Sequence, residues 1–442
     1  MKLALPKSVQ YIIETLTAHG FEAYAVGGCV RDAILGRKPD DWDITTSARP
    51  EQIKAVFRRT VDTGIAHGTV TVLHGGSGYE VTTYRIDGEY EDNRHPKEVS
   101  FTANLKEDLR RRDFTINAMA YNEEAGLVDE FGGMEDLKRK RICCVGAAEE
   151  RFGEDALRIL RGVRFAAQLG FTLESATKNA MKRLAPTLSN ISAERIQVEL
   201  SKLLLSKCPE QMDDLAEYEI AAVILPEYDG LAPDKRQWIV KQLKKLEAEK
   251  NIILQRSNTD EISLQRRKTD EIGKNFTKSE WLSLRWAAVL QFFTEEQTGT
   301  ILRRLKYDKK TMHNVQGILK FREKPEKADP VLIRKALCAM GELLFSMVLE
   351  FRRSQTEREE ALEELSHMLE MEQEILSRGE CVSLKELAVT GSDLMAVGCP
   401  KGKQIGRILN ILLEMVLESP EKNEKELLLH EAEKLINNVK QP

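Results

Sequence analysis

Hydrophobic and polar positions change their period near residue 150 of this 442-residue chain. Before that point, apolar residues follow a helical spacing at 7–19 and 50–57, and they alternate in period two at 68–75 and 79–85. The first spacing predicts helices, and the second predicts two strands of a hairpin. Strands are also expected at 22–28 and 41–46, with a short helix at 30–36. The first part therefore predicts a mixed α/β fold.

Helical periodicity dominates from about residue 150 to the end of the chain. Predicted helices occupy 154–168, 174–184, 192–206, 209–220, 234–249, 279–293, 330–351, 357–376, 403–417 and 423–438. The helical part is expected to divide near 208 and again near 325, where a polar stretch carries two prolines. We therefore predict an α/β head with a mixed sheet at 1–148, followed by an all-α neck at 149–208, body at 209–325 and tail at 326–442.

Two segments lack apolar periodicity. Residues 86–101 are polar and contain Pro and Gly, so a mobile loop is expected there. Residues 254–263 are followed by a second copy at 264–273 with seven of ten positions identical. The period of this duplication is too short for a solenoid unit, and its many charges predict a duplicated surface loop.

The composition fits a globular protein, with 42% hydrophobic and 31% charged residues. No run approaches the roughly 20 apolar residues of a membrane span, and the first residues are too polar for a secretory signal. Seven cysteines are scattered without a CxxC or a Cys/His metal spacing. These features predict a cytoplasmic protein in a reducing compartment, without a zinc site or a membrane.

The net charge of −5 does not by itself favour nucleic-acid binding, because phosphate contacts need a basic surface. Basic runs nevertheless occur at 110–113, 138–141, 158–164, 241–250 and 302–310. Each run taken singly is typical of a solvated helix face. Charge alone therefore leaves the partner open.

The first candidate site combines a Gly-Gly turn with two aspartates. Gly27 and Gly28 precede Arg31, and Asp41 and Asp43 follow within one short strand. Residues two apart on a strand share a face, so the carboxylates can hold two Mg²⁺ ions, which prefer oxygen ligands. The glycines allow backbone N–H groups to approach a triphosphate, and Arg31 adds a charged donor. Two metals would hold an attacking hydroxyl and a leaving pyrophosphate.

A third carboxylate is expected on a neighbouring strand, and Glu80 is the candidate. The strand position supports this choice loosely, and an exposed strand glutamate is the structural alternative.

The second candidate is the segment 111–118, RRDFTINA. Arg112 is positioned to meet phosphate, and Asp113 or Asn117 to meet a ribose hydroxyl. An ion network at the start of a helix explains the same residues equally well.

The third candidate is the segment 154–164, EDALRILRGVR. On one helix Asp155 and Arg158 would be neighbours at i, i+3, so an exposed salt bridge is the simple interpretation. Cytosine and adenine each show an amine donor beside a ring-nitrogen acceptor, whereas uracil and guanine show a carbonyl beside an N–H. An Asp acceptor beside an Arg donor would thus accept C and A and reject U and G. Arg161 and Arg164 would then face phosphates.

These three motifs, together with ISAERIQVEL at 191–200, resemble the class II tRNA nucleotidyltransferases, or CCA-adding enzymes, of the polymerase-beta-like superfamily. The resemblance covers about 20–205, and it continues more loosely at 391–428. It implies that Asp41 and Asp43 bind two Mg²⁺ and that Gly28 and Arg31 meet the triphosphate. It also implies a nucleotide pocket lined by Arg112, Asp155, Arg158, Arg161 and Arg164. The implied substrates are CTP and ATP, and the implied partner is tRNA, held by the tail.

Several alternatives remain open at this point. The segment Asp87–Phe101 is present, which disfavours CC-only addition but does not separate CCA from A-only addition. A bacterial poly(A) polymerase shares the head motifs, and a tRNA-binding protein with an inactive head is the non-enzyme alternative. No His-Asp pair typical of an appended phosphohydrolase is found. The oligomeric state, monomer or homodimer, is not determined by the sequence.

Overall fold

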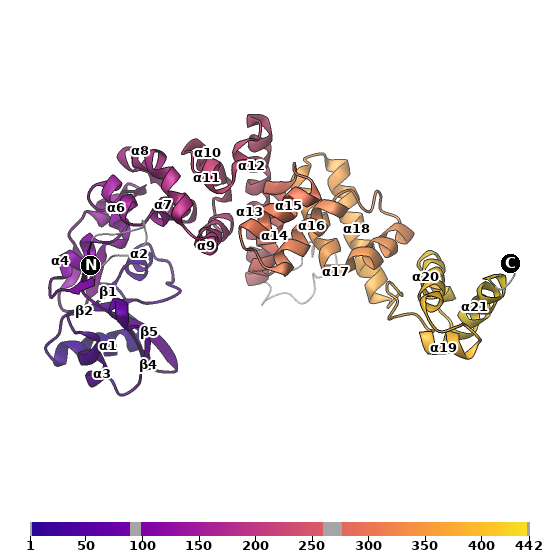
Figure 1. Cartoon of the computed structure of the whole chain (residues 1–442), viewed down its shortest axis with the longest axis horizontal. Helices are drawn as coiled ribbons and strands as arrows, with labels where there is room; N and C mark the ends of the chain where they lie inside the picture. The colour runs from indigo at the N-terminus through magenta and orange to yellow at the C-terminus, as the bar shows by residue number, and fades with distance from the viewer. Residues whose placement is uncertain (1, 89–98, 260–275, 440–442) are drawn as a thin grey trace. The chain divides into compact units, whose positions relative to one another are not determined.

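The computed structural model describes residues 2–88, 99–259 and 276–439. These residues divide into two compact units, Met1–Val240 with Arg304–Lys306, and Lys241–Arg303 with Tyr307–Pro442. Figure 1 shows the strands in the first unit and helices throughout the second. Among the described residues, no helix is both long and apolar enough to cross a bilayer.

A seven-stranded mixed sheet forms the centre of the head, in the order β3-β4-β5-β2-β1-β8-β9. Only β2 and β5 pair in parallel within it. The strands are β1 (Ala23–Val26), β2 (Ile44–Thr46), β3 (Thr60–Gly64), β4 (Thr69–His74), β5 (Ser77–Thr83), β8 (Met119–Asn122) and β9 (Gly126–Asp129). The predicted mixed α/β head and the hairpin at 68–85 are confirmed.

Helices α1 (Lys7–Ala18) and α3 (Pro50–Val56) pack on one face of this sheet, against buried Ile44, Val70 and Val81. Helix α4 (Leu105–Arg110) lies on the other face, where Asp108 accepts a hydrogen bond from Thr45 Oγ1 at 3.1 Å. The remaining short helices of the head are α2 (Gly28–Ile34) and α5 (Gly133–Lys138).

Sequence periodicity missed several strands in the head, namely β3, β8, β9 and two short strands around residues 85–101. Edge strand β3 carries polar and exposed residues, so it lacks the apolar alternation of a half-buried strand. Strands β6 (Arg85–Asp87) and β7 (Val99–Phe101) pair with each other at the two ends of the predicted loop. The ends of that segment are therefore strand, and residues 89–98 lie outside the described residues.

The first unit continues with the helices α6 (Ala148–Glu154), α7 (Leu157–Leu169), α8 (Ser175–Leu184), α9 (Ala193–Leu204), α10 (Asp214–Glu217), α11 (Ala221–Ile224) and α12 (Pro226–Asp229), of which the last three lie beyond the predicted neck. One short strand, β11 (Thr172–Leu173), pairs in parallel with β10 (Arg141–Ile142). The predicted single helix at 154–168 is wrong in one respect. Asp155 is extended, with φ −138° and ψ 104°, so the chain forms two helices there.

The second unit contains the end of α13 (Pro233–Thr259) and the helices α14 (Lys278–Leu290), α15 (Glu295–Arg304), α16 (Lys309–Phe321), α17 (Pro330–Gln355), α18 (Glu359–Ser377), α19 (Gly391–Ala396), α20 (Lys403–Glu418) and α21 (Lys425–Val439). Helix α17 is kinked at Gly341, whose φ of 76° lies in a region that strains residues with a side chain. The first six residues of the duplication end α13, whereas a surface loop was predicted. The rest of the duplication lies outside the described residues.

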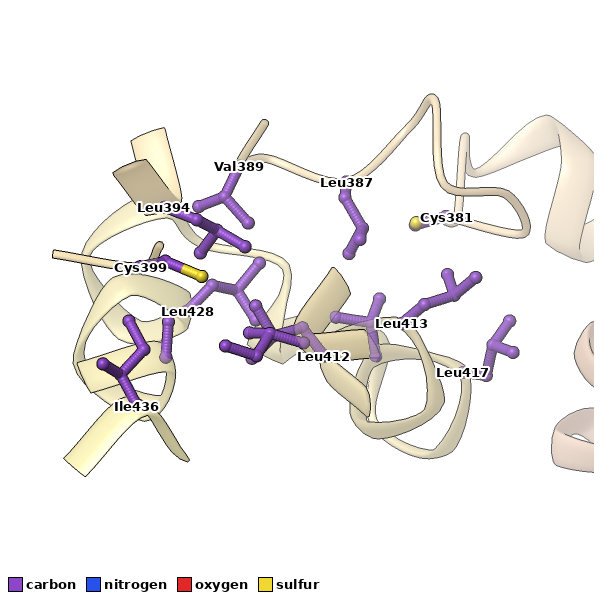
Figure 2. Close-up of a cluster of buried hydrophobic side chains, with 13 residues drawn as sticks. Cys381, Leu387, Val389, Leu394, Cys399, Leu412, Leu413, Leu417, Leu428 and Ile436 are labelled. Carbon is purple, nitrogen blue, oxygen red and sulfur yellow. The ribbon is translucent and has the colours of Figure 1, made fainter. Parts of the chain in front are cut away.

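The last helices share a separate apolar core. Leu412 and Val416 from α20 and Leu428 and Ile436 from α21 are at most 2% exposed. Figure 2 shows Leu412, Leu428 and Ile436 in one cluster with other buried side chains, including Leu394 of α19. Burying a leucine side chain contributes about 1.5–3 kcal/mol, so this small core stabilises the C-terminal helices.

Glu350 of α17 is a buried carboxylate that has consequences for stability. It is 5% exposed, and its Oε1 has no hydrogen-bond partner among the described residues. Burial raises the pKa of Glu350 to about 7, opposed by Arg353 and assisted by Glu249. Because the folded pKa lies above that of a free glutamate, stability decreases as pH rises towards 7.

The Glu350→Gln variant is therefore expected to be more stable than the native chain at pH 8, by roughly 1–3 kcal/mol, and similar to it at pH 5. Thermal unfolding at both pH values measures the difference. Glu342→Gln, an exposed position on the same helix, is the matched control and should change neither value. A loss of stability at pH 8 would contradict this assignment.

Candidate active site

Asp41 and Asp43 lie immediately before β2 and are exposed to solvent. The Asp43 carbonyl accepts a hydrogen bond from Val26 N at 3.0 Å, which ties this segment to the end of β1. The predicted strand at 41–46 therefore begins later, at Ile44, and the two carboxylates sit at its entrance.

Glu80 lies beside Asp43 on the neighbouring strand. The parallel register pairs Ile44 with Val81, so the preceding residues, Asp43 and Glu80, are also neighbours. Desolvation by the surrounding protein, together with the charges of Asp41 and Glu80, raises the pKa of Asp43 to about 6, and Arg112 opposes this shift. The three predicted carboxylates, of Asp41, Asp43 and Glu80, are thus close enough for their charges to interact.

The Gly-Gly turn lies on the other side of Asp43. Gly27 has φ 85°, and a Cβ at this position would lie 2.9 Å from Nη1 of Arg112. Only glycine combines this backbone conformation with such a close approach. Arg112 therefore sits between the turn and Asp43, and its Nε is buried without a hydrogen-bond partner among the described residues. Gly28 begins α2 directly after the turn.

Arg112 has a support that the sequence did not reveal. Asp108 is fully buried and lies 3.6 Å from Nη2 of Arg112. The same carboxylate accepts hydrogen bonds from Arg111 at 2.8 and 2.9 Å and from Thr45. Burial opposes ionisation of the Asp108 carboxyl, but the charges of Arg111 and Arg112 outweigh it and lower the pKa of Asp108. Asp108 is therefore an anion.

Arg31, Asn117 and Asp113 form one hydrogen-bonded chain. Arg31 donates to Asp32 at 2.8 and 3.1 Å and to Asn117 Oδ1 at 2.6 Å. Asn117 Nδ2 donates to Asp113 at 3.2 Å, and Asp113 also accepts from Arg161 at 2.8 Å. The ion network that the sequence left open for 111–118 is therefore present, and it links the head to α7.

Asp113 is a buried anion in this network. Burial alone would favour its neutral form, but the charges of Arg161 and Arg158 hold its pKa well below the usual range. Such a paired carboxylate fixes the positions of its partners.

Asp155 and Arg158 do not form the expected i, i+3 salt bridge. Asp155 accepts two hydrogen bonds from Arg195, at 2.8 and 3.3 Å, and one from Leu157 N at 3.1 Å. Arg158 donates to Glu154 at 2.5 Å. The expectation that both residues lie on one helix is wrong, because Asp155 is extended and α7 begins at Leu157, and the salt bridge offered as the simple interpretation is not formed.

Arg158 is 9% exposed, and it also donates to the carbonyls of Arg151 and Arg111 at 3.1 and 2.9 Å. Glu154 additionally pairs with Arg151 at 2.5 Å. The side chain of each member of the predicted base-reading pair is thus held by its own partner, while Arg158 N donates to the Asp155 carbonyl at 3.0 Å.

Arg161 and Arg164 surround Phe165, another residue that the sequence did not single out. The guanidinium of Arg164 lies 3.6 Å from the ring centroid, and those of Arg31 and Arg161 lie 5.1 and 5.3 Å away. Arg164 is 5% exposed and donates to Glu199 at 2.6 Å. Burial lowers the pKa of Arg164, and Glu199 opposes that shift. Arg161 retains a partly exposed side chain, whereas Arg164 is enclosed.

Three family models match this chain. They are the poly A polymerase head domain over 23–143, the probable RNA and SrmB-binding site of polymerase A over 170–231, and the putative tRNA nucleotidyltransferase domain 2 over 278–432. The CCA-adding enzyme of Leuconostoc mesenteroides is 36% identical over 431 residues, covering 97% of this chain and 96% of that protein. The chain belongs to the CCA-adding enzyme family.

Other members agree with this assignment. The CCA-adding enzyme of Geobacillus kaustophilus is 54% identical over 193 residues, which span 44% of this chain and 48% of that protein. The crystal structure of the Bacillus stearothermophilus CCA-adding enzyme in complex with CTP is similar to the whole chain, with a TM-score of 0.77, 33% identity and 98% of each chain covered. Family membership confirms the predicted resemblance, the polymerase-type head with its helical continuation, and nucleotidyl transfer as the reaction class.

Proposed function

We propose that this chain adds C and A from CTP and ATP to the 3′ end of tRNA, without a nucleic-acid template and with release of pyrophosphate. The observation that carries the proposal is the cluster of Asp41, Asp43 and Glu80 beside Arg112, in a chain that aligns with CCA-adding enzymes over almost its full length. A solved relative binds CTP, and the model matched at 278–432 is that of a tRNA nucleotidyltransferase.

Two Mg²⁺ ions are proposed as cofactors on Asp41 and Asp43, with Glu80 as an additional carboxylate. Desolvation, and after it the charges of Asp41 and Glu80, raises the pKa of Asp43, and a divalent cation would offset this clustered negative charge. Among the described residues no group of three or more His, Cys, Asp or Glu side chains is placed to hold a metal ion by itself, and Mg²⁺ usually keeps several waters and phosphate oxygens as ligands. When bound, the ions would lower the barrier by stabilising charge on the transferred phosphate.

Metal binding by Asp43 should depend on pH. Because the raised pKa leaves Asp43 partly protonated near pH 6, Mg²⁺ must displace a proton below that value. The Mg²⁺ concentration for half-maximal extension is expected to rise about fivefold between pH 6 and pH 5 and to be nearly constant above pH 7. tRNA binding in EDTA at each pH is the control. A half-saturating Mg²⁺ concentration that does not change between pH 5 and pH 7 would contradict the raised pKa of Asp43.

The chain's own residues are proposed to hold the nucleotide in three groups. Gly27, Gly28 and Arg112 would face the triphosphate, since Arg112 brings its charge against the turn and Asp43. The bonded chain of Arg31, Asn117, Asp113 and Arg161 would form the wall beside the ribose and phosphates. Arg164, bonded to Glu199, is proposed to support Arg161 through Phe165, and a phosphate contact of its own stays a prediction.

Asp155 and Arg158 are proposed to select the base. Asp155 Oδ2 accepts one hydrogen bond, from Arg195, and a carboxylate oxygen accepts about two, so it can also take the exocyclic amine of C or A. Arg158, fixed by Glu154, would donate to the ring nitrogen. Uracil and guanine would place a carbonyl against the carboxylate, a mismatch that costs about 1–3 kcal/mol per unpaired group.

The helical part is proposed to hold the RNA. Its division into neck (149–208), body (209–325) and tail (326–442) stays a prediction, as does a cytoplasmic location. The oligomeric state, monomer or homodimer, is left open.

Extension of tRNA that ends at the discriminator base tests the proposed function. Purified protein with Mg²⁺, CTP and ATP should lengthen this tRNA and leave a generic RNA unchanged. Long A tails on generic RNA without CTP would indicate a poly(A) polymerase instead. No extension with retained tRNA binding would indicate an inactive head.

A further inference from the structure

The sheet of the head has one closed face and one face that is covered only in part. On the closed face Val70, Val72 and Val81 are at most 1% exposed, beneath α1 and α3. On the other face α4 covers β2, where Asp108 bonds Thr45. Register places Thr82 opposite Thr45, and Thr71 opposite Glu80, on this second face.

Strand β2 divides this second face into two sides. Glu80 lies on β5, on one side of Asp43, and Gly27 with Arg112 lies at the end of β1, on the other side. The β1 side is cationic, since Arg112 and Arg31 meet there. This side is therefore the one that suits a triphosphate.

Among the described residues, the β5–β4–β3 side carries Glu80 and, at its outer end, the exposed Arg59, whose carbonyl accepts a hydrogen bond from Leu73 N at 3.0 Å. Leu73 and Val61 are 38% and 46% exposed, although both are large apolar residues on the sheet. Leu73 lies opposite Gly78, and Val61 lies opposite Thr71. A Cβ at Gly78 would meet Thr71 Cγ2 at 2.9 Å and Leu73 Cδ2 at 3.5 Å, so both methyl groups lean over the glycine.

The hydroxyl groups of this surface are bonded to one another. Thr63 Oγ1 lies 2.8 Å from Thr71 Oγ1, and Thr69 Oγ1 lies 3.0 Å from Thr82 Oγ1. With these polar groups satisfied, the surface presents mainly methyl groups. The surface can therefore contact the flat face of a nucleic-acid base without selecting one base over another by its hydrogen-bonding groups.

We propose that this open surface, formed by Val61, Thr63, Thr71, Leu73 and Gly78 and here named the acceptor platform, holds the 3′-terminal nucleotide of the RNA. The proposal rests on the proposed function. In the transfer the 3′-oxygen bonds to the α-phosphorus, the bond to the bridging oxygen of the leaving pyrophosphate breaks, and the hydroxyl proton passes to water. Attacking and leaving oxygens are in line, so acceptor and pyrophosphate occupy opposite sides of the α-phosphate.

Because the triphosphate binds on the cationic side of this face, the acceptor nucleotide binds on the other side, which carries Glu80. A platform of methyl groups also fits the sequence of reactions. During addition of C, C and A, the 3′-terminal base of the tRNA is first the discriminator and then C. A surface that makes no base-specific hydrogen bonds can hold each of these bases in turn.

Cross-linking tests the acceptor platform directly. A tRNA with 4-thiouridine at its 3′-terminal discriminator position is irradiated on the full chain, and the cross-linked peptide is identified by mass spectrometry. We expect cross-links within residues 61–78. Cross-links confined to the Gly27 turn or to residues 154–164 would overturn the proposal.

A kinetic comparison keeps the proposal testable if the cross-link is weak. Leu73→Gln should lower kcat/KM for an acceptor-stem minihelix about tenfold and leave the KM for CTP unchanged. Ala55→Gln, at an exposed apolar position on α3 across the sheet, is the control and should change neither value. Unaltered minihelix kinetics in Leu73→Gln, with active native protein, would refute the platform alone. Inactive native protein would instead refute the proposed function.

Discussion

Replacing Asp43 with asparagine is expected to reduce nucleotide addition to tRNA by about a thousandfold or more, a loss of roughly 4 kcal/mol in transition-state stabilisation. Asparagine keeps the size of the side chain but removes the charge that would hold a metal ion between Asp41 and Glu80. The rate is measured as incorporation of labelled CMP into tRNA that ends at the discriminator base. tRNA binding, measured by gel shift, should be retained.

Asp62→Asn is the matched control, because Asp62 is an exposed aspartate of the same sheet that pairs only with Lys54 at 3.0 Å in the described residues. This variant should extend tRNA at the native rate. Extension by Asp43→Asn within a few-fold of the native rate would show that the metal site lies elsewhere.

Replacing Arg158 with lysine is expected to lower the preference for CTP over UTP by about 10–100-fold. Lysine keeps the positive charge but cannot reproduce the planar set of donors that is held by Glu154 and by the carbonyls of Arg151 and Arg111. The ratio of kcat/KM for CTP and UTP, each measured in a single addition, reports the change.

Arg183→Lys provides the control, since Arg183 is an exposed arginine of α8 that pairs with Glu149. Its CTP preference should equal that of the native chain. Thermal unfolding of Arg158→Lys shows whether a change in preference is accompanied by loss of the fold. A folded Arg158→Lys variant with the native preference would exclude Arg158 from base selection.

Local motifs predicted the parts of the site that are close in sequence. The glycines at 27 and 28 and the aspartates at 41 and 43 belong to one strand–helix–strand unit, so their approach follows from chain geometry. Glu80 is different, because its place beside Asp43 depends on the parallel pairing of β2 with β5. That pairing joins segments more than thirty residues apart, and no local period determines it.

Base selection shows where sequence patterns fail. Apolar residues keep a helical spacing through 154–168, and periodicity therefore predicted one helix. The extended backbone of Asp155 interrupts it, and Asp155 turns to Arg195, forty residues further along the chain. An ion pair between distant helices leaves no periodic signal, which is also why Asp108 and Glu199 were not identified as partners of the site.

The central claim is addition of C and A, in that order, to tRNA, and the sequence of the products tests it most directly. Three tRNAs, ending at the discriminator base, after the first C and after CC, are incubated with CTP and ATP and then sequenced. We expect all three to end in CCA, through addition of three, two and one nucleotides. Extension of only the CC-ending tRNA would indicate A-only addition and would contradict the account.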